Sequence, residues 1–63
     1  MNYNNLSFYF GEKLKAIRVR NQLTQKVVEE RSGITAETLR RLERGDYLPQ
    51  MPTLEILSHL YNV

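Results

Sequence analysis

The chain has 63 residues, no cysteine and a formal net charge of +2. A chain of this length forms one domain at most and buries only about 60% of its unfolded surface. Without cysteine, neither disulfides nor thiolate metal sites can stabilise it, so apolar packing must do so. No apolar run approaches the roughly 20 residues of a membrane span, and the start lacks the features of a signal peptide. We therefore expect a soluble, cytoplasmic protein with no membrane partner.

The charge is unevenly distributed along the chain. Residues 1–31 contain six basic and three acidic residues, whereas residues 32–63 contain three basic and four acidic ones. A strongly basic domain would indicate a polyanionic partner by charge alone. The small net charge of this chain does not indicate such a partner, so its function has to be inferred from how the side chains are arranged.

Apolar residues at helical spacing predict a first helix over about residues 7–21. Phe10, Leu14 and Ile17 recur at steps of four and three, and Ser7 is suited to cap the start of the helix.

A second helix is predicted over about residues 25–32. Thr24 can cap its start, and Leu23 can pack on Val28 as a hydrophobic staple. Gly33 follows, and because glycine readily adopts a positive φ it can turn the chain sharply.

The same start signal then recurs and predicts a third helix over about residues 36–44. Thr35 provides the cap, Ile34 can pack on Leu39, and Gly45 can end the helix.

A fourth helix is predicted over about residues 51–61. Leu54, Leu57 and Tyr61 lie on one side of it, and Asn62 can close it. The chain shows no β-alternation and no repeat, so an all-α fold is expected.

Charged residues form a stripe on the side of the third helix opposite its leucines. Glu37, Arg40, Arg41 and Arg44 follow the spacing i, i+3, i+4 and i+7. One interpretation is a solvated face in which Glu37 pairs with Arg41, because such pairs stabilise a helix by roughly 0.2–0.5 kcal/mol. The other is a binding surface. The binding surface is favoured by the two short helices joined at a glycine, which form a helix-turn-helix. Such a motif presents its second helix outward and, in DNA-binding versions, places it in the major groove.

The sequence resembles the Cro and phage-repressor type of helix-turn-helix transcription regulators, the XRE family. The matching segments are LKAIR at 14–18, LTQ at 23–25, GIT at 33–35, LERG at 42–45, Pro49, Leu54, Leu57 and Tyr61. The resemblance implies a compact, all-α, four- to five-helix lambda-repressor-like domain that binds double-stranded DNA. Residues 1–10 are expected to form an aromatic N-terminal extension with the start of the first helix, and residues 11–63 the DNA-binding domain, with its motif at about 25–44.

The resemblance also implies which side chains contact DNA. The first, second and sixth positions of the third helix typically read bases, and these correspond to Ala36, Glu37 and Arg41. Gln25, which opens the second helix, corresponds to a phosphate contact. Further candidates for contacts to the DNA backbone are Thr24, Thr35, Thr38, Arg40, Arg44 and Tyr47.

Each base-reading candidate has a chemical rationale and an alternative. Arg41 can donate two hydrogen bonds to guanine, Glu37 can accept from the cytosine amino group, and Ala36 can touch a thymine methyl group. Alternatively, Glu37 and Arg41 pair with each other, and alanine only favours the helix. For Thr24 and Thr35, capping is the primary expected role.

Two charged residues are expected to be structural. In the family, an arginine late in the first helix pairs with the glutamate that ends the third, which implies a pair between Arg18 and Glu43.

The chain departs from the family pattern in two places. Glu29 stands where the family favours a small residue, and burying an unpaired carboxylate is costly. We therefore expect splayed helices, a solvated Glu29 side chain or a basic partner for it. The family usually adds a fifth helix after the position of Val63, so the chain is expected to be part of a longer regulator or to use its aromatic start as a substitute.

Catalysis is not expected, because His59 is the only histidine and no carboxylate pair is placed in a plausible cleft. No metal and no cofactor are expected either. The alternative to DNA binding is a protein-interaction module on the same fold, which the low net charge and Glu37 would suit.

Regulators of this kind act as two-fold dimers on DNA. A homodimer is therefore expected on DNA or within a longer parent protein, with weak self-association of this chain alone. Ile56 and Leu60 are candidates for a dimer contact or for docking a following segment or, alternatively, for the core. The sequence identifies no effector.

Overall fold

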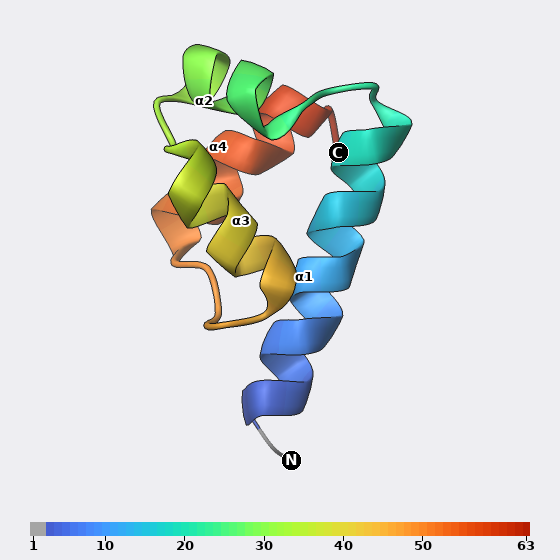
Figure 1. Cartoon of the computed structure of the whole chain (residues 1–63), viewed down its shortest axis with the longest axis vertical. Helices are drawn as coiled ribbons and strands as arrows, with labels where there is room; N and C mark the ends of the chain where they lie inside the picture. The colour runs from blue at the N-terminus through green and yellow to red at the C-terminus, as the bar shows by residue number, and fades with distance from the viewer. Residues whose placement is uncertain (1–2) are drawn as a thin grey trace.

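The computed structural model describes residues 3–63, with side chains from residue 6 onward. This part of the chain forms four α-helices and no strand (Figure 1). The helices are α1 (Tyr3–Arg20), α2 (Gln25–Ser32), α3 (Ala36–Arg44) and α4 (Met51–Tyr61). The long α1 runs down one side of the molecule and packs against α3, while α2 packs against α3 and α4. The predicted all-α fold class is confirmed.

The start of α1 differs from the prediction. The helix already includes Tyr3, so Ser7 lies inside it, buried, and the prediction that Ser7 caps the helix is wrong. Packing explains the longer helix, since Leu6 and Phe10 line a small cavity with Leu48, Pro49 and Leu54. Tertiary contacts of this kind stabilise helical turns that carry no local start signal.

The predicted caps of α2 and α3 are present. Thr24 Oγ1 accepts a hydrogen bond from the Val27 N–H, and Thr35 Oγ1 accepts one from the Thr38 N–H, each at 3.1 Å. Each threonine thereby satisfies one of the N–H groups that the first turn of a helix leaves without a partner. The bounds of both helices are those expected from the sequence.

Three residues in the left-handed region end the last three helices. Gly33 has φ +81°, Gly45 has φ +88° and Asn62 has φ +60°. In each case the backbone N–H of the residue bonds to a carbonyl of the last turn. The predicted ends of α2, α3 and α4 are therefore confirmed.

The core combines apolar side chains from all four helices. Its buried members are Leu14, Val28, Leu39, Leu42, Leu57 and Tyr61. Partly buried residues that pack against them are Ile17, Leu23, Ile34, Leu54 and Leu60. The staple residues before α2 and α3 thus lie at the edge of this core.

A glycine sets the distance between α1 and α3. A Cβ atom at Gly11 would lie 2.5 Å from the Leu42 carbonyl oxygen and 2.7 Å from that of Glu43. Because these are main-chain atoms, a larger residue would push the C-terminal turn of α3 away. Gly11 therefore helps to place the outer face of α3 relative to α1.

The buried hydroxyl of Tyr61 makes no hydrogen bond within the part of the chain described. Burial raises the pKa of Tyr61 to about 12. An unsatisfied buried polar group is costly, so Tyr61→Phe is expected to raise the free energy of unfolding by about 1 kcal/mol. Urea unfolding followed by circular dichroism measures this, and a destabilised variant would show that the hydroxyl has a partner in solution.

Candidate nucleic-acid interface

The helix-turn-helix formed by α2 and α3 presents one face of α3 to solvent. α3 buries Leu39 and Leu42, whereas Glu37, Arg40 and Arg41 are exposed. The orientation follows from the helical period, because the leucines and the charged residues lie on opposite sides. The stripe therefore faces outward, as the sequence predicts.

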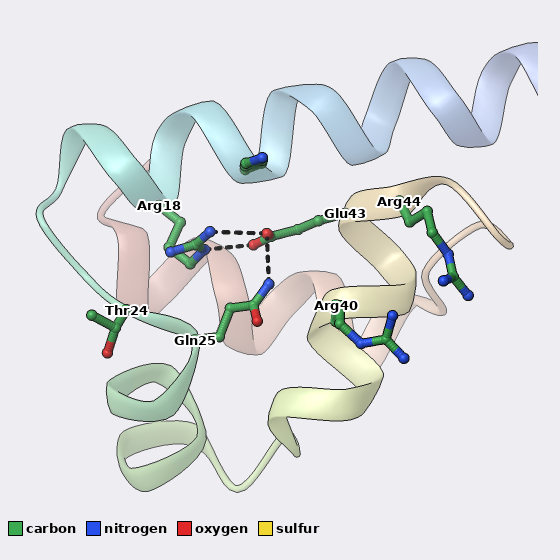
Figure 2. Close-up of a pocket in the computed structure, with 7 residues that line it drawn as sticks. Arg18, Thr24, Gln25, Arg40, Glu43 and Arg44 are labelled. Atoms are coloured by element: carbon green, nitrogen blue, oxygen red, sulfur yellow. Dashed lines mark hydrogen bonds and ion pairs between the residues drawn. The ribbon is translucent and has the colours of Figure 1, made fainter.

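A buried network of charged and polar groups fixes α3 to the rest of the domain (Figure 2). Arg18 donates from Nε to Glu43 Oε2 at 2.6 Å and from Nη2 to Glu43 Oε1 at 3.0 Å. Arg18 Nη1 also donates to the Leu23 carbonyl at 2.7 Å. The side chains of Arg18 and Glu43 are only 11% and 4% exposed, and their hydrogen bonds raise the pKa of Arg18. The structure thus contains the ion pair that the family resemblance implies.

Gln25 joins the same network. Its Nε2 donates to Glu43 Oε1 at 3.1 Å, so the first residue of α2 is held against the last turn of α3 (Figure 2). A primary amide carries two N–H donors and an acceptor oxygen. One donor of Gln25 is therefore left over for a phosphate, and its orientation is set by Glu43.

The exposed arginines of α3 each pair with a carboxylate. Arg40 donates to both Glu37 oxygens, with the shortest distance, from Nη2 to Oε2, at 2.8 Å, and Arg41 Nε donates to Glu37 Oε2 at 2.9 Å. Arg44 Nη2 donates to Asp46 Oδ2 at 2.5 Å. The pair of Glu37 with Arg41 is the one that helical spacing indicates. The sequence reasoning did not find the pairs of Arg40 and Arg44.

These ion pairs should be visible in the titration of the two carboxylates. Hydrogen bonds from Arg40 and then Arg41 lower the pKa of Glu37, and the hydrogen bond from Arg44 lowers the pKa of Asp46. A carboxylate with a depressed pKa stabilises the fold above its ordinary pKa, and this contribution is lost as the pH falls through the folded value. We expect side-chain NMR titration to give both pKa values below the ordinary range at low salt, moving toward it at high salt. Ordinary values at low salt would contradict the pairing.

An open groove of about 570 Å³ lies beside α3, between α1 and the start of α2 (Figure 2). Its lining consists of Lys15, Arg18, Thr24, Gln25, Arg40, Glu43 and Arg44. The lining contains four cationic side chains and one carboxylate; Arg18 is bound to that carboxylate, and Arg40 and Arg44 contact Glu37 and Asp46, which are not part of the lining. The excess of positive groups suits a phosphate. We refer to these residues as the basic groove. It brings together four of the predicted backbone contacts, namely Thr24, Gln25, Arg40 and Arg44.

The sequence reasoning missed Lys15 as a member of the basic groove. Lys15 precedes Arg18 by three residues, which places both on one side of α1. That spacing was the available signal. The remaining backbone candidates lie outside the basic groove. Thr35 and Thr38 bond to each other at the start of α3, and Thr38 and Tyr47 line a second groove.

Glu29 is accommodated by the main chain of α3. Its half-buried carboxylate accepts a hydrogen bond from the Ala36 N–H at 3.3 Å. Ala36 is the first residue of α3, where N–H groups lack partners within the helix and the helix dipole favours negative charge. A main-chain partner was not among the three expected solutions. The Glu29 carboxylate, which departs from the family pattern, therefore stabilises the start of α3.

The two candidates for a dimer contact differ in exposure. Ile56 is 42% exposed, whereas Leu60 is half-buried and packs against the core. Within residues 3–63, no helix combines the length and apolar character needed to cross a membrane, and no cluster of potential metal ligands occurs.

The arrangement of α2, the turn and α3 defines a helix-turn-helix domain. Residues 9–63 match the model of a family described as "Helix-turn-helix domain", and the chain belongs to this family. The match is consistent with the resemblance to the Cro and phage-repressor type and supports DNA as the partner. Comparisons with curated proteins and with solved structures gave no significant match.

Proposed function

We propose that this protein binds double-stranded DNA sequence-specifically, as a cytoplasmic, non-enzymatic transcription regulator of the Cro and phage-repressor type. The observation that carries the proposal is the position of the basic groove directly beside the exposed face of α3. A phosphate in the groove would bring that face against the base edges, because phosphate contacts set the position of a helix in the major groove.

The roles proposed for the side chains combine the family resemblance with the position of the basic groove. Arg41 and Glu37 read base edges together with Ala36, as donor, acceptor and methyl contact respectively. Gln25, held by Glu43, and Lys15 bind phosphates from the basic groove. The other backbone contacts proposed are Thr24, Thr35, Thr38, Arg40, Arg44 and Tyr47.

A two-fold homodimer on DNA is part of the proposal. Its half-sites would lie about one helical turn apart, and the exposed Ile56 on α4 is a candidate for the subunit contact.

Selection of bound sites from a random duplex pool tests the proposal. We expect a two-fold symmetric motif, and an affinity for it that falls steeply with salt. Arg41→Ala should relax the preference at one position in each half-site by about 1–3 kcal/mol. No selected motif and no binding at low salt would instead favour a protein-interaction module.

Lys13→Ala provides a matched control for the loss of one positive charge. The Lys13 ammonium lies over the Tyr9 ring, 5.3 Å from its centroid, outside both α3 and the basic groove. We expect this variant to keep the preference of the original chain. Equal loss of preference in both variants would show that Arg41 does not read a base.

A further inference from the structure

The positive charge on the outer face of α3 is partly neutralised by ion pairs within the chain. Glu37 contacts both Arg40 and Arg41, and Asp46 contacts Arg44, so each of the three arginines has an anionic partner. The side chains of Glu37, Arg40 and Arg41 are about half exposed, at 54%, 48% and 54%. Ion pairs this exposed contribute little to folding. Their main effect therefore falls on whatever approaches the face from solvent.

A DNA phosphate near this face would compete with Glu37 for the guanidinium groups of Arg40 and Arg41. Arg40 uses Nε and Nη2, and Arg41 uses Nε, to bind the Glu37 carboxylate. A phosphate that binds one of the two arginines brings a second negative charge next to Glu37 and leaves that carboxylate with a single cationic partner. Base edges present a different choice, because guanine can accept from arginine while cytosine donates to glutamate. When the contact between Glu37 and the arginines opens, only a matching base edge can supply both a new acceptor for an arginine and a new donor for Glu37.

We propose that Glu37 sets the discrimination of this surface by withholding Arg40 and Arg41 from phosphates. The inference rests on the proposed function and adds that Glu37 acts chiefly against non-matching DNA. Specificity depends on the difference between two affinities, so weakening the wrong complex is as effective as strengthening the right one. Glu37 is then a positioning residue for the two arginines as well as a base-reading candidate.

The test compares Glu37→Gln with Glu55→Gln. Both variants remove one negative charge, but Glu55 is exposed on α4 and makes no ion pair within residues 3–63. Binding is measured for the duplex selected by the original chain and for a non-matching duplex of equal length, between about 50 and 200 mM salt.

For Glu37→Gln, we expect affinity for the non-matching duplex to rise about tenfold at the lowest salt. The slope of log affinity against log salt should steepen by about 0.9 for each arginine that moves onto a phosphate. The ratio of matching to non-matching affinity should fall correspondingly. Glu55→Gln should leave slope and ratio close to those of the original chain.

Asp46→Asn provides a second variant, because it releases Arg44 alone. We expect a smaller steepening than for Glu37→Gln, and the effects of the two should add. Asp46→Asn leaves the sequence of α3 unchanged. It therefore shows whether freeing an arginine from its carboxylate steepens the salt dependence even if Glu37→Gln weakens the start of α3, which circular dichroism would reveal.

Two outcomes separate the inference from the proposed function. If the original chain prefers its selected site but a folded Glu37→Gln variant matches Glu55→Gln in slope and ratio, the role given to Glu37 is overturned and DNA reading stands, whatever Asp46→Asn does. If the original chain prefers no duplex at any salt, the proposed function fails, and the discrimination assigned to Glu37 fails with it.

Discussion

Replacing Glu43 by alanine is expected to lower the free energy of unfolding by about 3–5 kcal/mol, because it leaves the buried Arg18 guanidinium without its anionic partner. The substitution also removes the acceptor of the Gln25 amide. Domains have total stabilities of about 5–15 kcal/mol, and a chain this short should lie near the lower limit. Urea unfolding at neutral pH should therefore show a domain that is partly unfolded before denaturant is added.

Two further variants distinguish a lost ion pair from a lost side chain. Glu55→Ala removes an exposed carboxylate and should change stability by no more than about 0.5 kcal/mol. Replacing Arg18 by methionine and Glu43 by leucine together should recover most of the loss, since apolar substitutes for a buried pair are often neutral or stabilising. A cost below about 1 kcal/mol for Glu43→Ala would contradict a buried pair.

The same network links stability to the proposed interface. Glu43 orients Gln25, and both line the basic groove. A variant that keeps Glu43 but loses the amide, Gln25→Ala, retains the contact between Arg18 and Glu43. The two roles of the network, in holding α3 and in binding phosphate, can therefore be separated by mutation.

Local signals explain why the bounds of α2 and α3 could be predicted. Thr24 and Thr35 bond to N–H groups three residues ahead, and Gly33 and Gly45 end helices through their own φ angles. Interactions this short in sequence are visible to a reader of the sequence. The start of α1 could not be predicted in this way, because it depends on residues some forty positions away in the sequence, such as Leu48.

The candidate site divides in the same manner. Helical period placed the α3 stripe outward, and the family resemblance supplied the buried pair. Sequence spacing alone could not show that Glu37 binds Arg40 as well as Arg41, because the conformations of the side chains determine which arginines reach the carboxylate. It also could not show that Glu29 bonds to the Ala36 N–H, since a main-chain partner leaves no trace in residue types.

The packing of α1 on the turn after α3 leads to a second large effect, for Gly45→Ala. Two costs combine there. Gly45 has φ +88°, where a residue with a Cβ is strained by about 1–2 kcal/mol. The added Cβ would also lie 2.8 Å from Phe8 Cα, and such overpacking against a main chain costs about 1–3 kcal/mol more. We expect a total loss of about 2–5 kcal/mol in the free energy of unfolding.

Gly33→Ala separates the two costs within the same chain. Gly33 has nearly the same backbone conformation, with φ +81°, and nothing lies within 4 Å of its added Cβ. This variant should lose only the strain, about 1–2 kcal/mol. The difference between the two variants in urea unfolding therefore measures how firmly the first turns of α1 pack against Gly45. Equal losses would mean that Phe8 does not approach Gly45 in solution.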